Sequence, residues 1–246
     1  MTVAPEPAEA PLREALRHVD EFFDGVFAPL DRWVPTLASA LRRQSERGAL
    51  TGGHLAALAK PGAYEVLDTE GRPLYGAGFC ASDELVGEGN PLAWWQGPER
   101  ALLASSTFGP GQAAIDLMRL EWYRVPEATG DRHVAGPFVD YLCSNEVTIT
   151  SAVPLLVGGD FWGVVCADVL VSSLEEALLP VLDGHAGSTL VNANGRVVLS
   201  NDPDFETGDR YPGADPDDGL GALERSEGAV RVLSSQRYPF SLVVSA

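Results

Sequence analysis

Two apolar segments separated by a pair of glycines set the main constraint on the fold of this chain. They cover residues 146–156 and 162–171, and large apolar residues alternate in them with small or polar ones. Such alternation is typical of β-strands. Gly158 and Gly159 suit the tight turn of a hairpin, because glycine adopts positive φ angles without strain. The sequence therefore predicts a central β-hairpin.

A lone carboxylate, Asp168, lies near the end of the second predicted strand. A charged carboxylate in an apolar strand costs several kcal/mol unless it is paired, hydrogen-bonded or protonated. It is not needed to cap the helix that follows, because Ser172 and Ser173 each have a glutamate three residues later, a capping-box pattern. We therefore expect Asp168 to have a specific partner, and it is the first candidate binding residue.

The charge balance narrows the possible partners. The 246 residues include 17 Lys plus Arg against 35 Asp plus Glu, a net charge of −18. Nucleic acids and anionic membrane surfaces are therefore poor partners, whereas a cationic small ligand would be attracted. The length is enough for a full core, in one large or two small domains.

The sequence offers no export signal and no membrane span. Residues 1–15 lack the basic and apolar regions of a secretory signal, and the apolar run 152–171 is broken by two glycines and Asp160. Three cysteines without a C-x-x-C spacing do not form a disulfide framework. We expect a soluble cytoplasmic protein. The alternative is an excised extracellular domain, whose native flanking sequence would be strongly apolar.

The N-terminal 60 residues are expected to be a helical segment. Apolar residues at three- and four-residue spacing predict a helix over residues 11–29 that ends at Pro29, then a second from Pro35 to about Arg47. A third helix is expected to start at Thr51 and end before Pro61. These helices either pack on the rest of the chain or form the seam of a homodimer.

A short internal repeat indicates two related modules. Residues 67–74 and 191–198 both contain a polar turn with Gly followed by Arg between apolar segments, the pattern of a hairpin. The predicted modules cover residues 61–185 and 186–246. In the second, strands are expected near 188–200, 229–234 and 239–245, with an acidic mobile loop at 202–227.

The middle of the chain resembles a known family. A helix predicted over residues 111–124 carries Trp122 and Tyr123, and a loop to Gly136 leads into Gly-Pro-Phe-Val-Asp, a hairpin with Val-Pro, and Gly-Val-Val-Cys-Ala-Asp. This order resembles the membrane-distal half of the double Cache sensor domains of bacterial receptors, over about residues 60–246. The resemblance implies an α+β fold with two PAS-like antiparallel-sheet modules that binds a small molecule and signals.

The resemblance also implies a binding site. In amino-acid-binding members, an Asp and tyrosines hold the amino group, and an Arg two residues before the Trp holds the carboxylate. Here Leu120 is at that Arg position, Arg119 is one residue earlier, and Phe138 replaces a Tyr. These departures favour an amine without a carboxylate, held by Asp168 and by aromatic faces. The expected ligand-binding residues are Arg119, Glu121, Trp122, Tyr123, Phe138, Tyr141 and Asp168.

No catalytic motif is present. The sequence contains no H-E-x-x-H, Walker loop, G-x-S-x-G or C-x-x-C, and its four histidines are isolated from one another. We therefore expect a binding protein with no metal and no cofactor, which passes its signal to a separate partner such as a transcriptional regulator or a transporter. The alternatives are an organic-acid sensor that uses Arg119, Arg124, Arg132 and Tyr123, and an enzyme.

Overall fold

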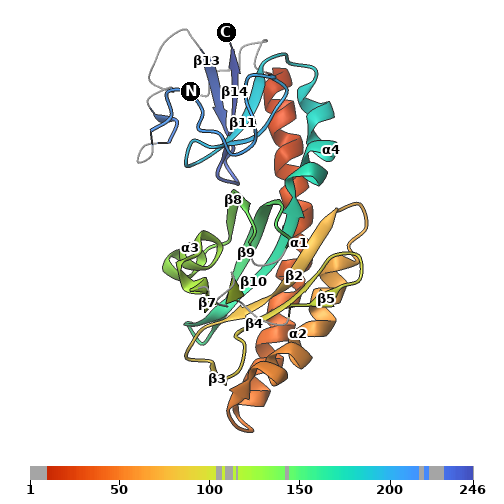
Figure 1. The fold of residues 1–246 in the computed structure, drawn as a ribbon, viewed down its shortest axis with the longest axis vertical. Helices are drawn as coiled ribbons and strands as arrows, with labels where there is room; N and C mark the ends of the chain where they lie inside the picture. The colour runs from red at the N-terminus through yellow and green to blue at the C-terminus, as the bar shows by residue number, and fades with distance from the viewer. Residues whose placement is uncertain are drawn as a thin grey trace, which may run out of the picture. The chain divides into compact units, whose positions relative to one another are not determined.

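The structure, a computed structural model, describes residues 10–103, 107–108, 113–114, 116–141, 144–215, 219–221 and 230–245 (Figure 1). Contacts between residues divide the chain into two units. The larger unit contains Asp24–Ala135 and Val139–Leu170, and the smaller contains Met1–Phe23, Gly136–Phe138 and Val171–Ala246. The sequence-based boundaries after residues 60 and 185 stay predictions.

A six-stranded sheet is the framework of the larger unit, with strand order β5-β4-β2-β10-β9-β8. The predicted hairpin is confirmed as β9 and β10, which pair antiparallel on either side of Gly158 and Gly159. β10 also pairs with β2, so it lies inside the sheet. The bounds are β2 Leu74–Ala81, β4 Leu92–Gln96, β5 Ala101–Leu102, β8 His133–Val139, β9 Val147–Val157 and β10 Asp160–Leu170.

Helices lie on both faces of this sheet (Figure 1). On one face, α2 (Gly52–Leu67) brings Tyr64 to a ring-centroid distance of 6.3 Å from Trp95 of β4. On the other face, α3 (Glu121–Thr129) packs on β9 and β10. Side chains of a strand alternate between the faces. Because Asp168 and Trp95 fall on opposite faces in the strand register, Asp168 faces the α3 side.

The N-terminal helices are longer than the sequence indicated. The predicted helix end at Pro29 and the new start at Pro35 are wrong, because one helix, α1 (Ala10–Ser45), runs through both prolines. Likewise α2 continues through Pro61. Each proline removes one backbone donor. Fully buried residues on either side of the α1 prolines, including Phe27, Leu30 and Leu37, retain their packing only if the helix continues.

The predicted central helix and the loop predicted after it also differ from the structure. In place of one helix over 111–124, the described residues form a 3₁₀ turn, Leu117–Arg119, and then α3, which contains Pro126 and ends at Gly130 with φ 73°. Leu120 interrupts the two because its backbone is extended, with ψ 140°. The residues before Gly136 form β8 rather than a loop. Outside the two larger sheets, the short strands β1 Leu50–Thr51 and β3 Val86–Glu88 form one pair, and β6 Thr107–Phe108 and β7 Ala113–Ala114 form another.

The smaller unit has an antiparallel sheet of order β12-β11-β14-β13, at the strands expected from sequence. Its elements are α4 Val171–Leu182, β11 Ser188–Asn192, β12 Val197–Ser200, β13 Val230–Ser234 and β14 Phe240–Ser245. The capping-box prediction is wrong, because Ser172 and Ser173 lie inside α4. The described part of the acidic segment, residues 202–215 and 219–221, is not simply a mobile loop, since Tyr211 and Leu220 are buried in the core of this unit. The rest of the predicted loop lies outside the described residues.

The two copies of the internal repeat have the same kind of turn but different elements on either side of it. Gly71 and Gly195 both have positive φ, 69° and 73°, as the pattern predicted. Only the second copy is a hairpin, between β11 and β12. The first copy joins the end of α2 to β2, because the residues before Gly71 continue the helix.

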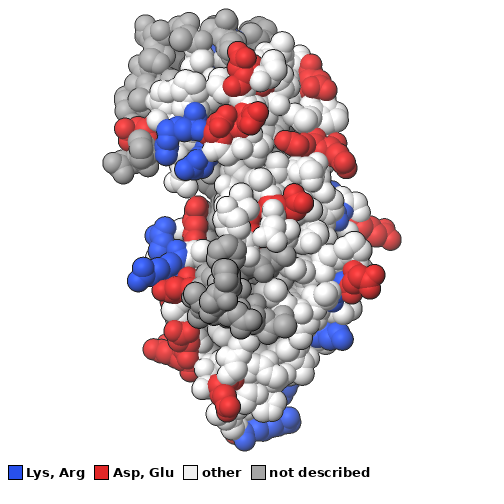
Figure 2. Space-filling view, in the orientation of Figure 1, with Lys and Arg blue, Asp and Glu red and all other residues white. Residues whose placement is uncertain are grey.

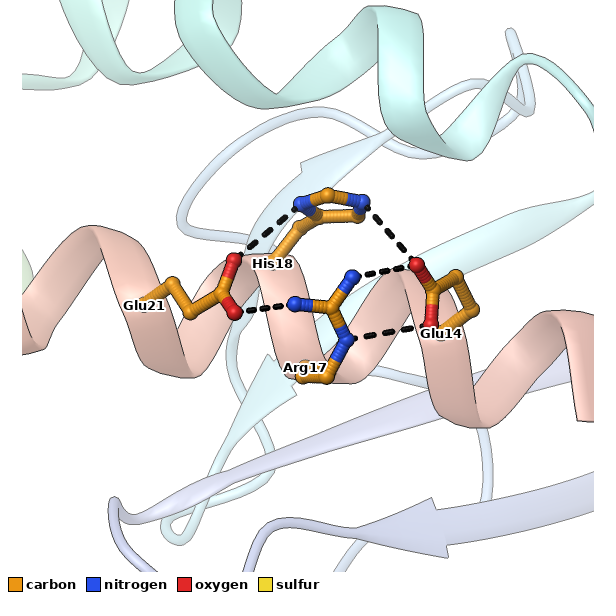
Figure 3. Close-up of polar contacts among 4 residues, drawn as sticks. All are labelled: Glu14, Arg17, His18 and Glu21. Atoms are coloured by element: carbon orange, nitrogen blue, oxygen red, sulfur yellow. Dashed lines mark hydrogen bonds and ion pairs between the residues drawn. The ribbon is translucent and has the colours of Figure 1, made fainter.

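The solvent side of α1 carries an ion-pair cluster (Figure 3). Arg17 pairs with Glu14 and with Glu21, and each nitrogen of His18 lies 3.5 Å from one of these carboxylates. The Arg17 hydrogen bond lowers the pKa of Glu14. The opposite side of the helix is apolar and buried in the chain itself, with Phe23 at ring-centroid distances of 5.6 Å from Tyr238 and 4.9 Å from Phe240. A dimer through α1 would therefore have to use other residues.

Replacement of Pro35 should stabilise the protein. Pro35 is exposed inside α1, so Pro35→Ala restores a backbone donor without disturbing the core. We expect the free energy of unfolding to rise by about 1–3 kcal/mol, measured by urea denaturation. Pro73→Ala, at an exposed position outside the helices, is the control and should not stabilise. An unchanged or lower stability for Pro35→Ala would contradict a continuous helix.

Candidate functional site

Asp168 lies in a row of residues that crosses four strands on one face of the sheet. In the ladder Asp168 pairs with Gly76 of β2 and with Thr150 of β9, and Gly76 pairs with Gln96 of β4. Paired residues of neighbouring strands project on the same side. Asp168 is 5% exposed and Thr150 is 3% exposed, so the centre of the row is buried, whereas Gln96 at its end is half-buried.

The partner expected for Asp168 is Thr150. Its hydroxyl Oγ1 donates to Asp168 Oδ1 at 2.6 Å. Burial raises the pKa of Asp168 well above its ordinary value; the Thr150 hydrogen bond acts against this rise, and the negative charge of Asp140 adds to it. A carboxyl group in this environment is stable in its neutral form and needs a nearby cation to ionise readily.

The neighbouring row brings an indole to the same face. Trp94 of β4 pairs with Gly78, which pairs with Cys166 of β10. The Trp94 ring covers the glycines of β2: a Cβ at Gly76 would lie 2.7 Å from Trp94 Cζ2, and one at Gly78 would lie 2.6 Å from Cε3. Trp94 Nε1 is buried, and among the described residues it has no hydrogen-bond partner. The face around Asp168 therefore contains an unused donor.

The two aromatic residues predicted on α3 lie in the interior. Trp122 is 8% exposed and Tyr123 is fully buried, and their ring centroids are 6.3 Å apart. Burial is the main cause that raises the pKa of Tyr123, with a smaller effect from Cys80. The Tyr123 ring contacts Phe161 at 5.4 Å. Phe161 precedes Asp168 by seven residues along β10, about 23 Å at the rise of a strand, so this contact is toward the other end of the strand.

The remaining predicted residues have other contacts. The Arg119 side chain is 86% exposed and its Nε lies 2.9 Å from Asp116. Glu121 lies 2.8 Å from His133 Nε2. Tyr141 is 58% exposed, and Phe138 is half-buried in the strand segment that groups with the smaller unit. Ligand contacts by these residues stay predictions.

An acidic cavity of about 760 Å³ lies beside the β9–β10 turn. Its described lining has four carboxylates and no basic residue: the lining residues are Ser82, Asp83, Glu84, Leu85, Met118, Glu127, Gly159, Asp160, Phe161 and Trp162. Asp168 is not among them. Figure 2 shows Asp and Glu spread over the face drawn, in keeping with the net charge of −18. The larger unit thus has two places suited to a cation.

Two negative findings concern the described residues alone. Within them, no three His, Cys, Asp or Glu side chains are grouped as they would be around a metal ion. No helix in that part of the chain is both long enough and apolar enough to cross a membrane.

Three residues around Asp168 were not predicted from the sequence. Thr150 and Gly76 meet Asp168 through strand pairing, and Trp94 belongs to the neighbouring row on the same face. A signal was present: two glycines alternate in β2, as Gly76 and Gly78, and a Trp occurs in the next strand. Glycine within a strand often marks a site that another group approaches closely.

Comparisons with known proteins support the fold. No family model matches the chain, and no curated protein matches it. The structure is similar to the ligand-binding domain of the Pseudomonas fluorescens chemoreceptor CtaA in complex with L-valine, with TM-score 0.54, 15% identity and coverage of 92% of this chain and 94% of the other. It is also similar to the ligand-binding domain of Pseudomonas aeruginosa PAO1 PctB in complex with L-Arg, with TM-score 0.52, 16% identity and coverage of 98% and 88%.

A third similar structure is the ligand-binding domain of the Campylobacter jejuni chemoreceptor Tlp3 in complex with L-norvaline, with TM-score 0.50, 11% identity and coverage of 98% and 94%. At these low sequence identities, the comparisons support a similar fold and no more. The predicted α+β fold and the resemblance to Cache-type sensor domains are confirmed at that level.

The buried carboxyl should make stability depend on pH. Because the folded pKa of Asp168 is raised, its contribution is present below the unfolded pKa of about 3.9 and is lost as the pH rises toward the folded value. For the ligand-free protein, we expect the unfolding free energy to fall over this window by at most about 1.4 kcal/mol per pH unit from this group.

Asp168→Asn should remove that fall and should be more stable than the parent at the upper end of the window, in urea denaturation from pH 5 to 8. Asp160→Asn is the matched control, since Asp160 is an exposed residue of the same strand. The assignment fails if Asp168→Asn and the parent have the same pH dependence.

Proposed function

We propose that the chain is a small-molecule sensor domain that binds an amine or an amino acid, with the ligand's ammonium group on Asp168. The observation that carries the proposal is the buried carboxylate of Asp168, whose only hydrogen-bond donor among the described residues is Thr150. An ammonium group is the natural complement, because it supplies both a positive charge and several donors.

The energetics favour a cationic ligand. In the empty site, ionisation of Asp168 is opposed by burial and by the negative charge of Asp140. A bound ammonium ion offsets both effects, so the site gains more from a cation than an exposed carboxylate would. Trp94, a buried aromatic residue on the same face of the sheet as Asp168, can add cation–π attraction.

The structurally similar proteins support the ligand class. Three chemoreceptor domains of this fold are described in complex with L-valine, L-Arg and L-norvaline, and these ligands share an α-ammonium group. Leu120 stands at the position where an Arg is expected to hold the ligand's carboxylate. This difference leaves the ligand's carboxylate without that Arg. The ammonium group is therefore the part of the ligand that the proposal specifies.

Signalling follows from differential binding. A ligand shifts a conformational equilibrium only if it binds one arrangement better than the other. A separate protein, such as a transcriptional regulator or a transporter, would receive the signal, and a homodimer is one form in which it could be transmitted.

The organic-acid alternative has weaker support. Of its arginines, Arg119 is exposed and paired with Asp116, and Arg132 lies 3.1 Å from Asp31. Each guanidinium group already has a carboxylate partner, which offsets its attraction for a carboxylate ligand. No observation favours an enzyme over a binding protein.

A thermal-shift screen tests the proposal. The probes are the twenty amino acids, their decarboxylated amines and a set of organic acids, applied to the parent, Asp168→Asn and Asp160→Asn. A ligand at 100 times its Kd adds about 2.7 kcal/mol, or roughly 5–10 °C for a chain of this size. We expect amines or amino acids to stabilise the parent and Asp160→Asn, and not Asp168→Asn.

Two results would contradict the proposal. Stabilisation lost in Asp160→Asn and kept in Asp168→Asn would place the cation in the acidic cavity. Stabilisation by organic acids alone would favour the arginine-based alternative.

Binding should release a proton. Below the raised pKa of Asp168 the empty site is largely protonated, and a bound ammonium ion forces the carboxyl group to ionise. We expect affinity to rise by up to about tenfold per pH unit in this range. Calorimetry in buffers of different ionisation enthalpy measures the proton count directly. Binding without proton exchange across pH 5–8 would show that Asp168 is already ionised or is not the ligand's partner.

A further inference from the structure

Trp94 holds a donor that nothing in the described part of the chain uses. The residue is 5% exposed, and its indole Nε1 is buried with no hydrogen-bond partner among the described residues. Native proteins leave few buried donors unpaired, and each such case calls for an explanation. A missing ligand is one such explanation when the donor faces a site.

The position of the donor is set by the glycines of β2. A Cβ built at Gly76 would lie 2.9 Å from Trp94 Nε1. Gly76 is the ladder partner of Asp168 on the same face, and the Cβ atoms of such partners are about 4.5–5.5 Å apart. Nε1 therefore lies within about 8 Å of the Asp168 Cβ. One small molecule can contact both groups.

The glycines of β2 allow the Trp94 indole to lie at this position. A side chain at Gly76 or Gly78 would meet the Trp94 ring at 2.7 or 2.6 Å and displace it. The ring thus lies against the bare backbone of β2 between its own strand and β10. Trp95, the next residue, points to the opposite face and packs on Tyr64 of α2. The two tryptophans of β4 therefore have different surroundings, and only Trp94 shares the face of Asp168.

We infer that Trp94 is a ligand-binding residue, and that its Nε1–H donates to an oxygen on the ligand carbon that is bonded to the amine-bearing carbon. The inference rests on the proposed function, since it assumes an ammonium group on Asp168. The ligand class is a small amine with a neighbouring acceptor oxygen, as in α-amino acids and β-amino alcohols. Trp94 is a neutral donor, so a carboxylate is accepted without the Arg that Leu120 replaces.

The test compares probes that have both the amino group and the acceptor oxygen with a probe that has the amino group alone. The probes are the best-binding of the twenty amino acids, the amino alcohol derived from it, and its decarboxylated amine, which lacks the oxygen. Trp94→Phe keeps an aromatic ring and removes the N–H. We expect this variant to bind the amino acid and the amino alcohol about tenfold or more weakly, and the amine within about twofold of the parent, by calorimetry.

Two further variants separate the loss of the N–H donor from a general effect of changing a buried residue. Trp95→Phe changes a buried tryptophan of the same strand on the opposite face, and it should leave the ratio of amino-acid to amine affinity unchanged. Gly76→Ala keeps the indole N–H and displaces the ring, and it should lower that ratio as Trp94→Phe does.

The outcomes distinguish the inference from the function on which it rests. If Asp168→Asn abolishes binding while Trp94→Phe keeps the full preference for the amino acid over the amine, the inference is overturned and the proposed function stands. If none of the amino acids, amino alcohols or amines binds the parent, both fail. An equal loss for all three probes in Trp94→Phe would make Trp94 a packing residue and overturn the inference.

Discussion

The cost of burying one carboxyl group is the main electrostatic constraint on the six-stranded sheet. Asp168 lies inside the six-stranded sheet with a single hydrogen bond, from Thr150, among the described residues. Natural sheets place apolar side chains at such positions, because an ionised carboxylate without a partner is unstable there. A site with this property is poorly satisfied when empty and better satisfied with a cation, which is the energetic requirement for a sensor whose conformations respond to ligand.

The sheet around Asp168 combines a buried carboxyl group with a buried indole. Two glycines in β2 leave the space that the Trp94 ring occupies, and among the described residues the Trp94 N–H has no hydrogen-bond partner. On the opposite face the same strands are packed against α2 through Trp95 and Tyr64. The face with Trp95 is thus packed against a helix, and the face with Asp168 carries the buried polar groups. Polar groups on one face therefore leave the packing on the other face intact.

The sequence predicted strands better than it predicted helices. The hairpin of β9 and β10, the strands of the smaller unit and the positive φ of Gly71 and Gly195 follow from local rules of alternation and turn geometry. The helix ends failed at Pro29, Pro35 and Pro61, because buried apolar contacts outweigh the local cost of a proline. Propensity is a weak guide wherever tertiary packing rewards the longer helix.

For the candidate site, the sequence by itself determined that Asp168 would be a polar group in an apolar strand and would need a partner. It did not identify Thr150, Gly76 or Trp94, which lie on three other strands. Register decides which residues of different strands share a row, and register depends on the pairing of the whole sheet rather than on any local pattern. Only the tertiary structure could bring the Trp94 indole and the Asp168 carboxyl group to the same face of the sheet.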